Sequence, residues 1–311
     1  MKSCVILLLL LHITGVAFAQ STLAERLGYP KDAKLLIIHA DDLAVAHSEN
    51  QASFKAMKEG SVSSASVMVP CPWLKEVVEY AQKNPNHDLG LHLTLTSEWQ
   101  WYKWGPAAPR GEVPGLVDAN GYFYDNCADV AKNAKPEEVE RELRAQIEKA
   151  KALGLEPTHL DSHMGCVFFT NPQNFATYLK LAKEYGIPPM VNRQMVEGII
   201  NQAPQVFAGV FDDKIPVIDQ IYGASEADYK NGMAKYYAKT LREMPPGVHV
   251  MIIHTAYNNE EMQGITVNHP GWGAAWRQAD YDFFTSKACK KILKEKNIHV
   301  ITWREIGKLM K

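Results

Sequence analysis

Short apolar or alternating runs and amphipathic stretches follow one another along most of this 311-residue chain. The first kind predicts strands, which we place at residues 35–39, 64–69, 88–96, 157–161, 190–193, 249–254 and 298–302. The second kind predicts helices, at residues 48–60, 73–83, 135–153, 175–185, 226–244, 279–296 and 303–310. We find no internal repeat or linker. Regular alternation of this kind predicts a single α/β domain with a parallel sheet, most simply a barrel.

Three stretches do not follow the alternation. Residues 97–133 are rich in tryptophan, proline and glycine and exceed an ordinary connection, so we expect a functional or covering loop. Trp99 and Trp101 in this loop suit stacking on sugar rings, and they equally suit packing of the loop on itself. Residues 199–221 are ambiguous, and residues 258–276 are expected to form a polar loop.

The amino terminus has the pattern of a signal peptide. A lysine precedes a leucine-rich run that ends in Ala17-Phe18-Ala19, a small-x-small cleavage pattern. The run is too short for a membrane anchor. We therefore expect a signal peptide at residues 1–19, a barrel domain at residues 20–311, and an exported protein, periplasmic or secreted, that has no membrane contact once the signal is removed.

Charge and cysteine content exclude some partners and leave other questions open. Lysine plus arginine number 33 and aspartate plus glutamate 35, interspersed without a basic stripe, so nucleic acid is not an expected partner. Four cysteines lie outside the signal segment, at Cys71, Cys127, Cys166 and Cys289, and they show no zinc-binding spacing. They allow three complete pairings, or all of them are small buried residues. The oligomeric state is also open, with a homodimer among the possibilities.

Acids and histidines recur where the predicted strands end. The residues in such positions are Asp41, Asp42, His92, His163, Arg193 and His254. Because the carboxyl ends of parallel strands share one face of a barrel, these side chains are expected to converge there. Asp41 and Asp42 are adjacent, so a regular strand would turn them to opposite faces. Both can serve one site only if the chain leaves strand geometry at this point.

An aspartate with two histidines is typical of an open divalent-metal site. A second carboxylate can accept a proton from the attacking water, and a further histidine can protonate a leaving group. A single histidine at a strand end is more often a hydrogen-bonded structural residue, and we interpret His39, His47, His159 and His269 in that way. Repetition of the same placement on several strands is what favours a site.

Four segments also resemble a known family. They are LLIIHADDLA at 35–44, GSVSSASVMV at 60–69, LGLHLTLT at 89–96 and PTHLDSHMG at 157–165. In order and combination they resemble the YdjC-like carbohydrate deacetylases, a group that includes chitooligosaccharide deacetylases. The resemblance implies an irregular TIM-like barrel that removes N-acetyl groups from an amino-sugar oligosaccharide with one divalent metal ion. It implies Asp42, His92 and His163 as the metal ligands and Asp41 as the general base.

The sequence departs from the family pattern around these positions. His39 replaces the usual asparagine, Leu43-Ala44 replaces Phe-Gly, and Met164-Gly165 replaces further histidines, which changes the floor of the pocket. The general acid is assigned to His254, which directly follows an apolar strand, and His269 in His-Pro-Gly is the competitor.

Other assignments follow from this interpretation. Zinc and magnesium are the first candidates for the metal, and nickel, cobalt and manganese remain open. Arg193, Trp99 and Trp101 are expected to position the carbohydrate. The alternatives are a metal-dependent phosphodiesterase or another amidase on the same barrel, or a non-catalytic carbohydrate-binding relative.

Overall fold

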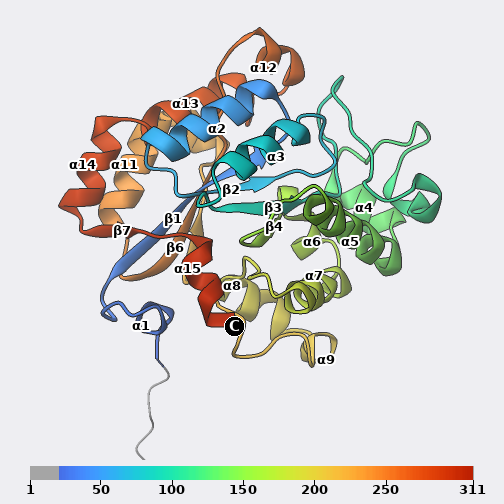
Figure 1. Cartoon of the computed structure of the whole chain (residues 1–311), viewed down its shortest axis with the longest axis horizontal. Helices are drawn as coiled ribbons and strands as arrows, with labels where there is room; N and C mark the ends of the chain where they lie inside the picture. The colour runs from blue at the N-terminus through green and yellow to red at the C-terminus, as the bar shows by residue number, and fades with distance from the viewer. Residues whose placement is uncertain (1–20, 311) are drawn as a thin grey trace, which may run out of the picture.

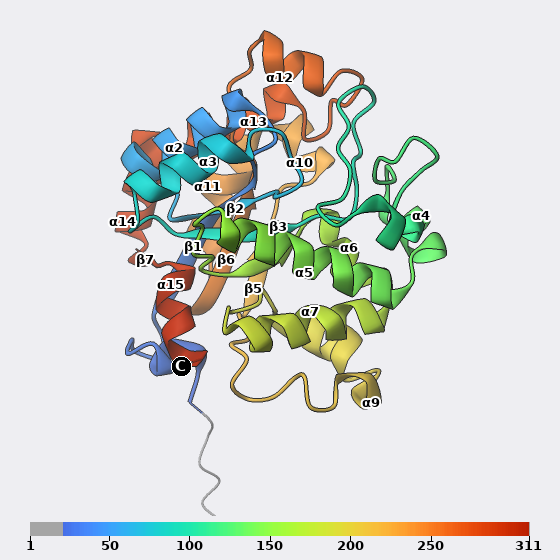
Figure 2. The ribbon, with the colours of Figure 1, turned by 45° about the vertical axis from the view of Figure 1, so that its right-hand side comes forward.

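The computed structural model describes residues 21–310, so the predicted signal peptide lies outside the described residues. Seven parallel strands form one sheet in the order β4-β3-β2-β1-β6-β5, with β7 also paired to β1. The sheet is curled and surrounded by helices (Figures 1 and 2). The strands are β1 (Lys34–Leu43), β2 (Ser64–Val67), β3 (Leu89–Leu93), β4 (Leu160–Ser162), β5 (Gln220–Tyr222), β6 (Gly247–Ile253) and β7 (Ile298–Val300). The predicted α/β class with a parallel sheet is confirmed.

The helices cover the outside of the sheet. They are α1 (Leu23–Arg26), α2 (His47–Glu59), α3 (Leu74–Lys83), α4 (Cys127–Asn133), α5 (Pro136–Ala152), α6 (Cys166–Phe169), α7 (Pro172–Tyr185), α8 (Arg193–Met195), α9 (Pro204–Phe207), α10 (Glu226–Asn231), α11 (Met233–Glu243), α12 (Glu260–Ile265), α13 (Ala274–Phe284), α14 (Lys287–Glu295) and α15 (Trp303–Ile306). Short 3₁₀ or π turns add η1 (Arg110–Glu112), η2 (Pro114–Leu116), η3 (His163–Gly165), η4 (Val196–Ile200) and η5 (Gly307–Met310). None of the helices between residues 21 and 310 is long and apolar enough to cross a membrane.

Most predicted elements are present, and the exceptions have local causes. The predicted strand at 190–193 is wrong as a regular strand, because this stretch makes only isolated bridges, such as Asn192 to Ile218, before α8 begins. The helix predicted at 226–244 is two helices separated by Gly232, whose φ of 104° is non-helical. The helix predicted at 279–296 is also two, α13 and α14. The expected loop at 258–276 contains α12.

The open side of the curled sheet lies between β4 and β5. Residues 188–193 cross it, since the Met190 amide donates to the Leu160 carbonyl and the Ile218 amide donates to the Val191 carbonyl. The sheet is therefore a half-barrel whose gap is spanned by an irregular segment.

Strand β1 lies at the centre of the sheet, between β6 on one side and β2 with β7 on the other. Every residue of β1 after Lys34 is buried, which explains the apolar run in the sequence. The burial continues through the two acids that close the strand, Asp41 and Asp42, so their charges need partners inside the protein.

The structure answers the open question about the cysteines. Cys127 and Cys166 form a disulfide, whereas Cys71 and Cys289 are free and buried. The structure therefore has one disulfide and two buried thiols. This differs from both expectations, which were two disulfides or four free cysteines.

Candidate active site

The end of β1 leaves strand geometry, as the adjacent acids require. Asp42 has a φ of 68° and Ala44 a φ of 81°, and the pairing register with β2 shifts between Ala40 and Leu43. Aspartate tolerates the left-handed region better than most residues. As a result, the carboxylates of both Asp41 and Asp42 line the same cavity.

This cavity lies at the carboxyl ends of the strands and has a volume of about 1230 Å³. Its lining includes the side chains that the sequence placed after four different strands, namely Asp41, Asp42, His92, His163 and His254. The expected convergence of these residues at one face of the sheet is therefore observed.

Asp42, His92 and His163 form a compact set of metal-ligating atoms. The Oδ1 atom of Asp42 lies 3.2 Å from Nε2 of His92 and 3.2 Å from Nδ1 of His163. This oxygen is buried and has no hydrogen-bond partner of adequate geometry. Two imidazole nitrogens and an unpaired carboxylate oxygen that face one another fit a divalent cation in both chemistry and spacing.

The second nitrogen of each histidine is bound by a carboxylate. Nδ1 of His92 lies 2.7 Å from Oδ1 of Asp161, and Nε2 of His163 lies 2.9 Å from Oε2 of Glu98. Carboxylates in this position orient metal-binding histidines and leave the other nitrogen free for the ion. Neither Asp161 nor Glu98 was predicted from the sequence as a site residue. The one available signal was the position of Asp161 inside the PTHLD strand.

His39 links the general-base candidate to the same network. Its Nε2 lies 2.7 Å from Oδ2 of Asp161 and 3.0 Å from Oδ1 of Asp41, and its Nδ1 lies 3.1 Å from the Ser64 hydroxyl. Burial opposes the charged form, but the hydrogen bonds to Asp161 and Asp41 outweigh it and raise the pKa of His39 to about 9. The residue is hydrogen-bonded, as expected, and it also holds Asp41.

Charges in the site balance one another. Burial favours the neutral form of Asp42, but the nearby Arg277 guanidinium and His163 hold the pKa of Asp42 well below its usual range. Burial likewise disfavours a charged His163, and the Glu98 and Asp42 carboxylates outweigh it and raise its pKa to about 9. The carboxylates of Glu98 and Asp42 therefore favour positive charge in this part of the site.

A buried arginine, Arg277 on α13, closes one side of the site. Its Nη2 donates to Oδ2 of Asp42 over 2.8 Å, its Nη1 donates to Glu49, and its Nε donates to the carbonyl of Trp272 over 2.6 Å. Burial raises the pKa of Glu49 well above its usual range, even though Arg277 acts against this. Neither residue was predicted from the sequence, because nothing in the local pattern of either helix distinguishes them.

Both candidates for the general acid line the cavity. His254 follows β6, and its Nε2 lies 4.0 Å from Oδ2 of Asp41. Burial lowers its pKa to about 4, so the ring is neutral near pH 7. His269 lies on the segment between α12 and α13 and lines the same cavity. Of the two general-acid candidates, His254 is the one that approaches the acids, at 4.0 Å from Asp41 and 3.9 Å from Asp42.

The residues predicted to position substrate are dispersed. Trp99 lines the cavity but is only 2% exposed, and it packs edge-to-face on Trp104 while the Arg277 guanidinium lies over its ring. Trp101 is 74% exposed and is not among the lining residues. The position of Trp99 is therefore explained by packing within the loop. Trp101 does not line the cavity, so the structure gives no support for its expected role in binding carbohydrate.

The structure corrects the placement of Arg193. Its Nε lies 2.7 Å from Oδ1 of Asp219, whose other carboxylate oxygen accepts the Val248 amide at the amino end of β6. The Arg193 side chain is therefore turned toward Asp219 and does not line the cavity, although its neighbours Asn192 and Gln194 do.

Comparisons with known proteins agree with this arrangement. The family model of the YdjC-like proteins matches residues 35–295. A carbohydrate deacetylase of Thermus thermophilus is 32% identical over 293 residues, covering 91% of this chain and 97% of that protein. A carbohydrate deacetylase of Brevibacillus brevis is 37% identical over 153 residues, covering 49% of this chain and 57% of that protein. A solved structure from Enterococcus faecalis, provisionally described as a cellobiose-phosphate cleavage protein, superposes with a TM-score of 0.71 at 25% identity, covering 88% of this chain and 99% of that one.

Proposed function

The chain belongs to the family of YdjC-like proteins, and from this premise we propose that it is a metal-dependent hydrolase that removes N-acetyl groups from an amino-sugar oligosaccharide. The observation that carries the proposal is the unpaired Oδ1 of Asp42, which faces two imidazole nitrogens at 3.2 Å each inside a large cavity. The names of the relatives from Thermus thermophilus and Brevibacillus brevis supply the reaction.

Asp42, His92 and His163 would hold one divalent ion. When bound, such an ion polarises the acetamide carbonyl and stabilises the negative charge that develops on its oxygen. Two nitrogens and one carboxylate oxygen suit zinc, and they accept magnesium with additional water ligands. Asp161 and Glu98 would keep the two histidines in the orientation that the ion requires.

Asp41 would act as the general base. Its Oδ1 is held by His39 and by the Ser66 hydroxyl at 3.3 Å, and its Oδ2 lies 3.7 Å from Nε2 of His92 and 4.0 Å from Nε2 of His254. Oδ2 would accept the proton of the water whose oxygen attacks the acetamide carbon. The carbon–nitrogen bond then breaks, and acetate and an amine are the products.

His254 would deliver a proton to the departing amine. Because its pKa of about 4 keeps it neutral near pH 7, it must gain this proton during the reaction. Asp41, 4.0 Å away, is a donor within short reach after it has taken a proton from water. His254 would therefore work as a shuttle between the base and the leaving group.

Carbohydrate is the substrate class that the cavity and the relatives favour. A volume of about 1230 Å³ exceeds the roughly 300–1000 Å³ of ordinary small-molecule pockets and provides room for more than one sugar ring. A phosphodiesterase would need free cations for phosphate. Among the described lining residues, Arg277 is the arginine, and it is already paired with Asp42 and Glu49. A binding protein without turnover would have no need of Asp41 beside the ligand set.

We also propose that the half-barrel corresponds to an irregular TIM-like barrel closed through residues 188–193, and that the mature protein is exported, either to the periplasm or outside the cell. The Cys127–Cys166 disulfide supports export, because disulfides persist mainly in oxidising compartments. Secretion of a fusion of residues 1–19 to a reporter would test the second statement, and retention of that reporter in the cytoplasm would contradict it.

The function is tested by metal content and by acetate release from N-acetylated oligosaccharides of increasing length. Asp41→Asn is expected to retain the metal and to lower acetate release by about 100-fold or more. His254→Gln is expected to lower kcat more than His269→Gln does, since His254 lies beside Asp41. Absence of a bound divalent ion in the wild-type protein, or full acetate release by Asp41→Asn, would refute the proposal.

A further inference from the structure

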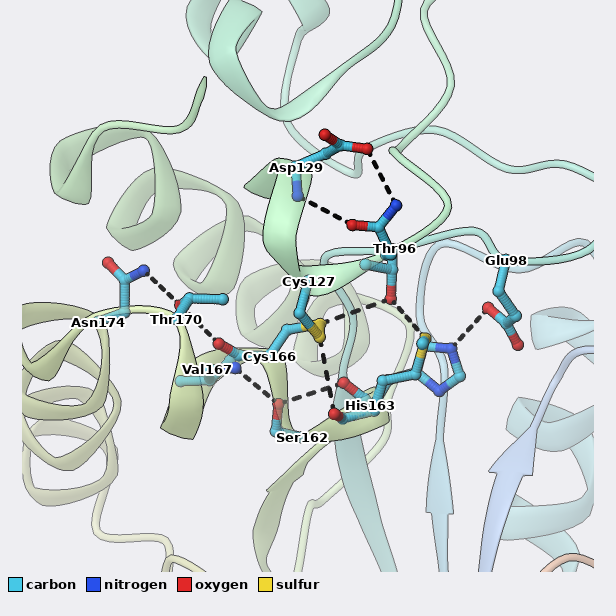
Figure 3. Close-up of a disulfide and its surroundings, with 12 residues drawn as sticks. Thr96, Glu98, Cys127, Asp129, Ser162, His163, Cys166, Val167, Thr170 and Asn174 are labelled. Atoms are coloured by element: carbon cyan, nitrogen blue, oxygen red, sulfur yellow. Dashed lines mark hydrogen bonds and ion pairs between the residues drawn. A yellow bond between two sulfur atoms is a disulfide. The ribbon is translucent and has the colours of Figure 1, made fainter. Parts of the chain in front are cut away.

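The Cys127–Cys166 disulfide joins two segments that border the proposed metal site. Cys127 opens α4, in the long segment that follows β3, and Cys166 opens α6, three residues after His163. Figure 3 shows the bridge next to the turn that carries the His163 ring, with the Glu98 carboxylate on the other side of that ring. The segment after β3 therefore contacts the His163 turn twice, through Glu98 and through Cys127.

The turn that carries His163 has an unfavourable backbone. Met164 has a φ of 53° and Gly165 a φ of 68°, so two consecutive residues are left-handed directly after His163. Methionine has no special tolerance for this region, so the surrounding structure must hold it there. Non-covalent support comes from the Cys166 amide, which donates to the His163 carbonyl, from the Thr96 hydroxyl, which lies 3.3 Å from the Met164 sulfur, and from the Val167 amide, which donates to the Ser162 hydroxyl over 3.1 Å.

We propose that the Cys127–Cys166 disulfide is a positioning element for His163, so that the metal site is complete only in the oxidised protein. The inference rests on the proposed metal-binding role of Asp42, His92 and His163. The bridge fixes the carboxyl-terminal end of the turn at Cys166, while β4 fixes its other end at Ser162. A turn held at both ends cannot relax to right-handed geometry and swing Nδ1 of His163 away from Oδ1 of Asp42.

A purely stabilising bridge would behave differently. Closing a loop across a sequence separation of 39 restricts the unfolded chain, and this raises the unfolding temperature without any change in the folded site. Metal affinity measured on folded protein separates the two roles, because only a positioning bridge alters it.

The experiment uses the mature full-length protein. Mass spectrometry of non-reduced peptides establishes the pairing. Calorimetry then compares the zinc affinity of wild type, of the Cys127→Ala/Cys166→Ala variant and of Cys289→Ala. The last variant is the matched control, because it removes a buried sulfur elsewhere in the protein. We expect zinc affinity to fall about 10-fold or more in the double variant, as when an orienting partner is lost, and to stay unchanged in Cys289→Ala. Adding Met164→Gly to the double variant should recover part of the affinity, because glycine adopts positive φ without cost.

The outcomes separate this inference from the proposed function. If wild type binds zinc and the folded double variant binds it equally well, the positioning role is refuted while the metal site stands. If wild type binds no divalent ion, the proposed function is refuted and the inference with it. Should the double variant not fold, the same titration on wild type reduced under native conditions, with reduction verified by mass, decides the point in the same way.

Discussion

The ion pairs of Arg277 supply a sharp test of how the buried charges are arranged. Arg277 is 1% exposed and bridges Asp42 and Glu49, both fully or almost fully buried. Substituting Met for Arg277 preserves most of the apolar volume but leaves two carboxylates without their cation. We therefore expect the metal-free protein to be strongly destabilised.

The magnitude follows from the surroundings of the two acids. Removing one partner of a buried ion pair costs roughly 3–5 kcal/mol. The His92 and His163 rings stay 3.2 Å from the other oxygen of Asp42 and can offset its charge when protonated. Glu49 already has a pKa well above its usual range, so it will take up a proton. Both effects limit the loss, and we expect a decrease of about 3 kcal/mol in the free energy of unfolding, which lowers Tm by roughly 6 °C or more.

Urea unfolding of the metal-free protein, followed by circular dichroism, measures this loss. Arg193→Met is the matched control, because Arg193 pairs with Asp219 while its side chain is 61% exposed, and such pairs contribute about 0–1 kcal/mol. Adding Glu49→Gln to Arg277→Met should change the stability by less than about 1 kcal/mol, since Glu49 is expected to be protonated and uncharged once Arg277 is gone. A loss below about 1 kcal/mol for Arg277→Met, or a large recovery in the double variant, would refute the reasoning.

Three further results are expected. In the metal-free protein the pKa values of His39 and His163 are raised from an ordinary 6.5 to about 9. Their protonated forms therefore stabilise the folded protein fully below about pH 6.5, and this stabilisation is lost as pH rises through 9. Equal urea midpoints at about pH 6 and about pH 9 would contradict this. Gly90→Ala would place a Cβ 2.3 Å from the buried His159 ring and should cost about 1–3 kcal/mol, whereas Tm within a degree of wild type would show that the ring can move. Trp101→Ala should change KM less than about twofold, because this exposed side chain is not in the cavity lining; a larger change would restore its role in sugar stacking.

The local sequence pattern predicted where helices lie better than it predicted where they are interrupted or which side chains reach the site. Breaks at Gly232 and at Thr285–Ser286 divide two predicted helices, because amphipathic spacing continues across a short interruption that the backbone does not follow. The segment 190–195 reaches the cavity without forming a regular strand, since Asn192 and Gln194 line it, but the Arg193 side chain pairs with Asp219 instead.

The sequence by itself determined the α/β class, the central apolar strand, and the acids and histidines at strand ends. These features depend on neighbours in the chain, and parallel pairing then brings the ends together. It even indicated that the backbone must break at the adjacent acids, which the φ of 68° at Asp42 realises.

Only the tertiary structure decided which groups support that site. Arg277 reaches Asp42 across 235 positions and Glu49 across 228, Glu98 reaches His163 across 65, and the disulfide spans 39. No local periodicity encodes such pairs, because each depends on where two separately formed elements meet in space. The sequence therefore located the candidate ligands, and packing selected the residues that neutralise, orient and brace them.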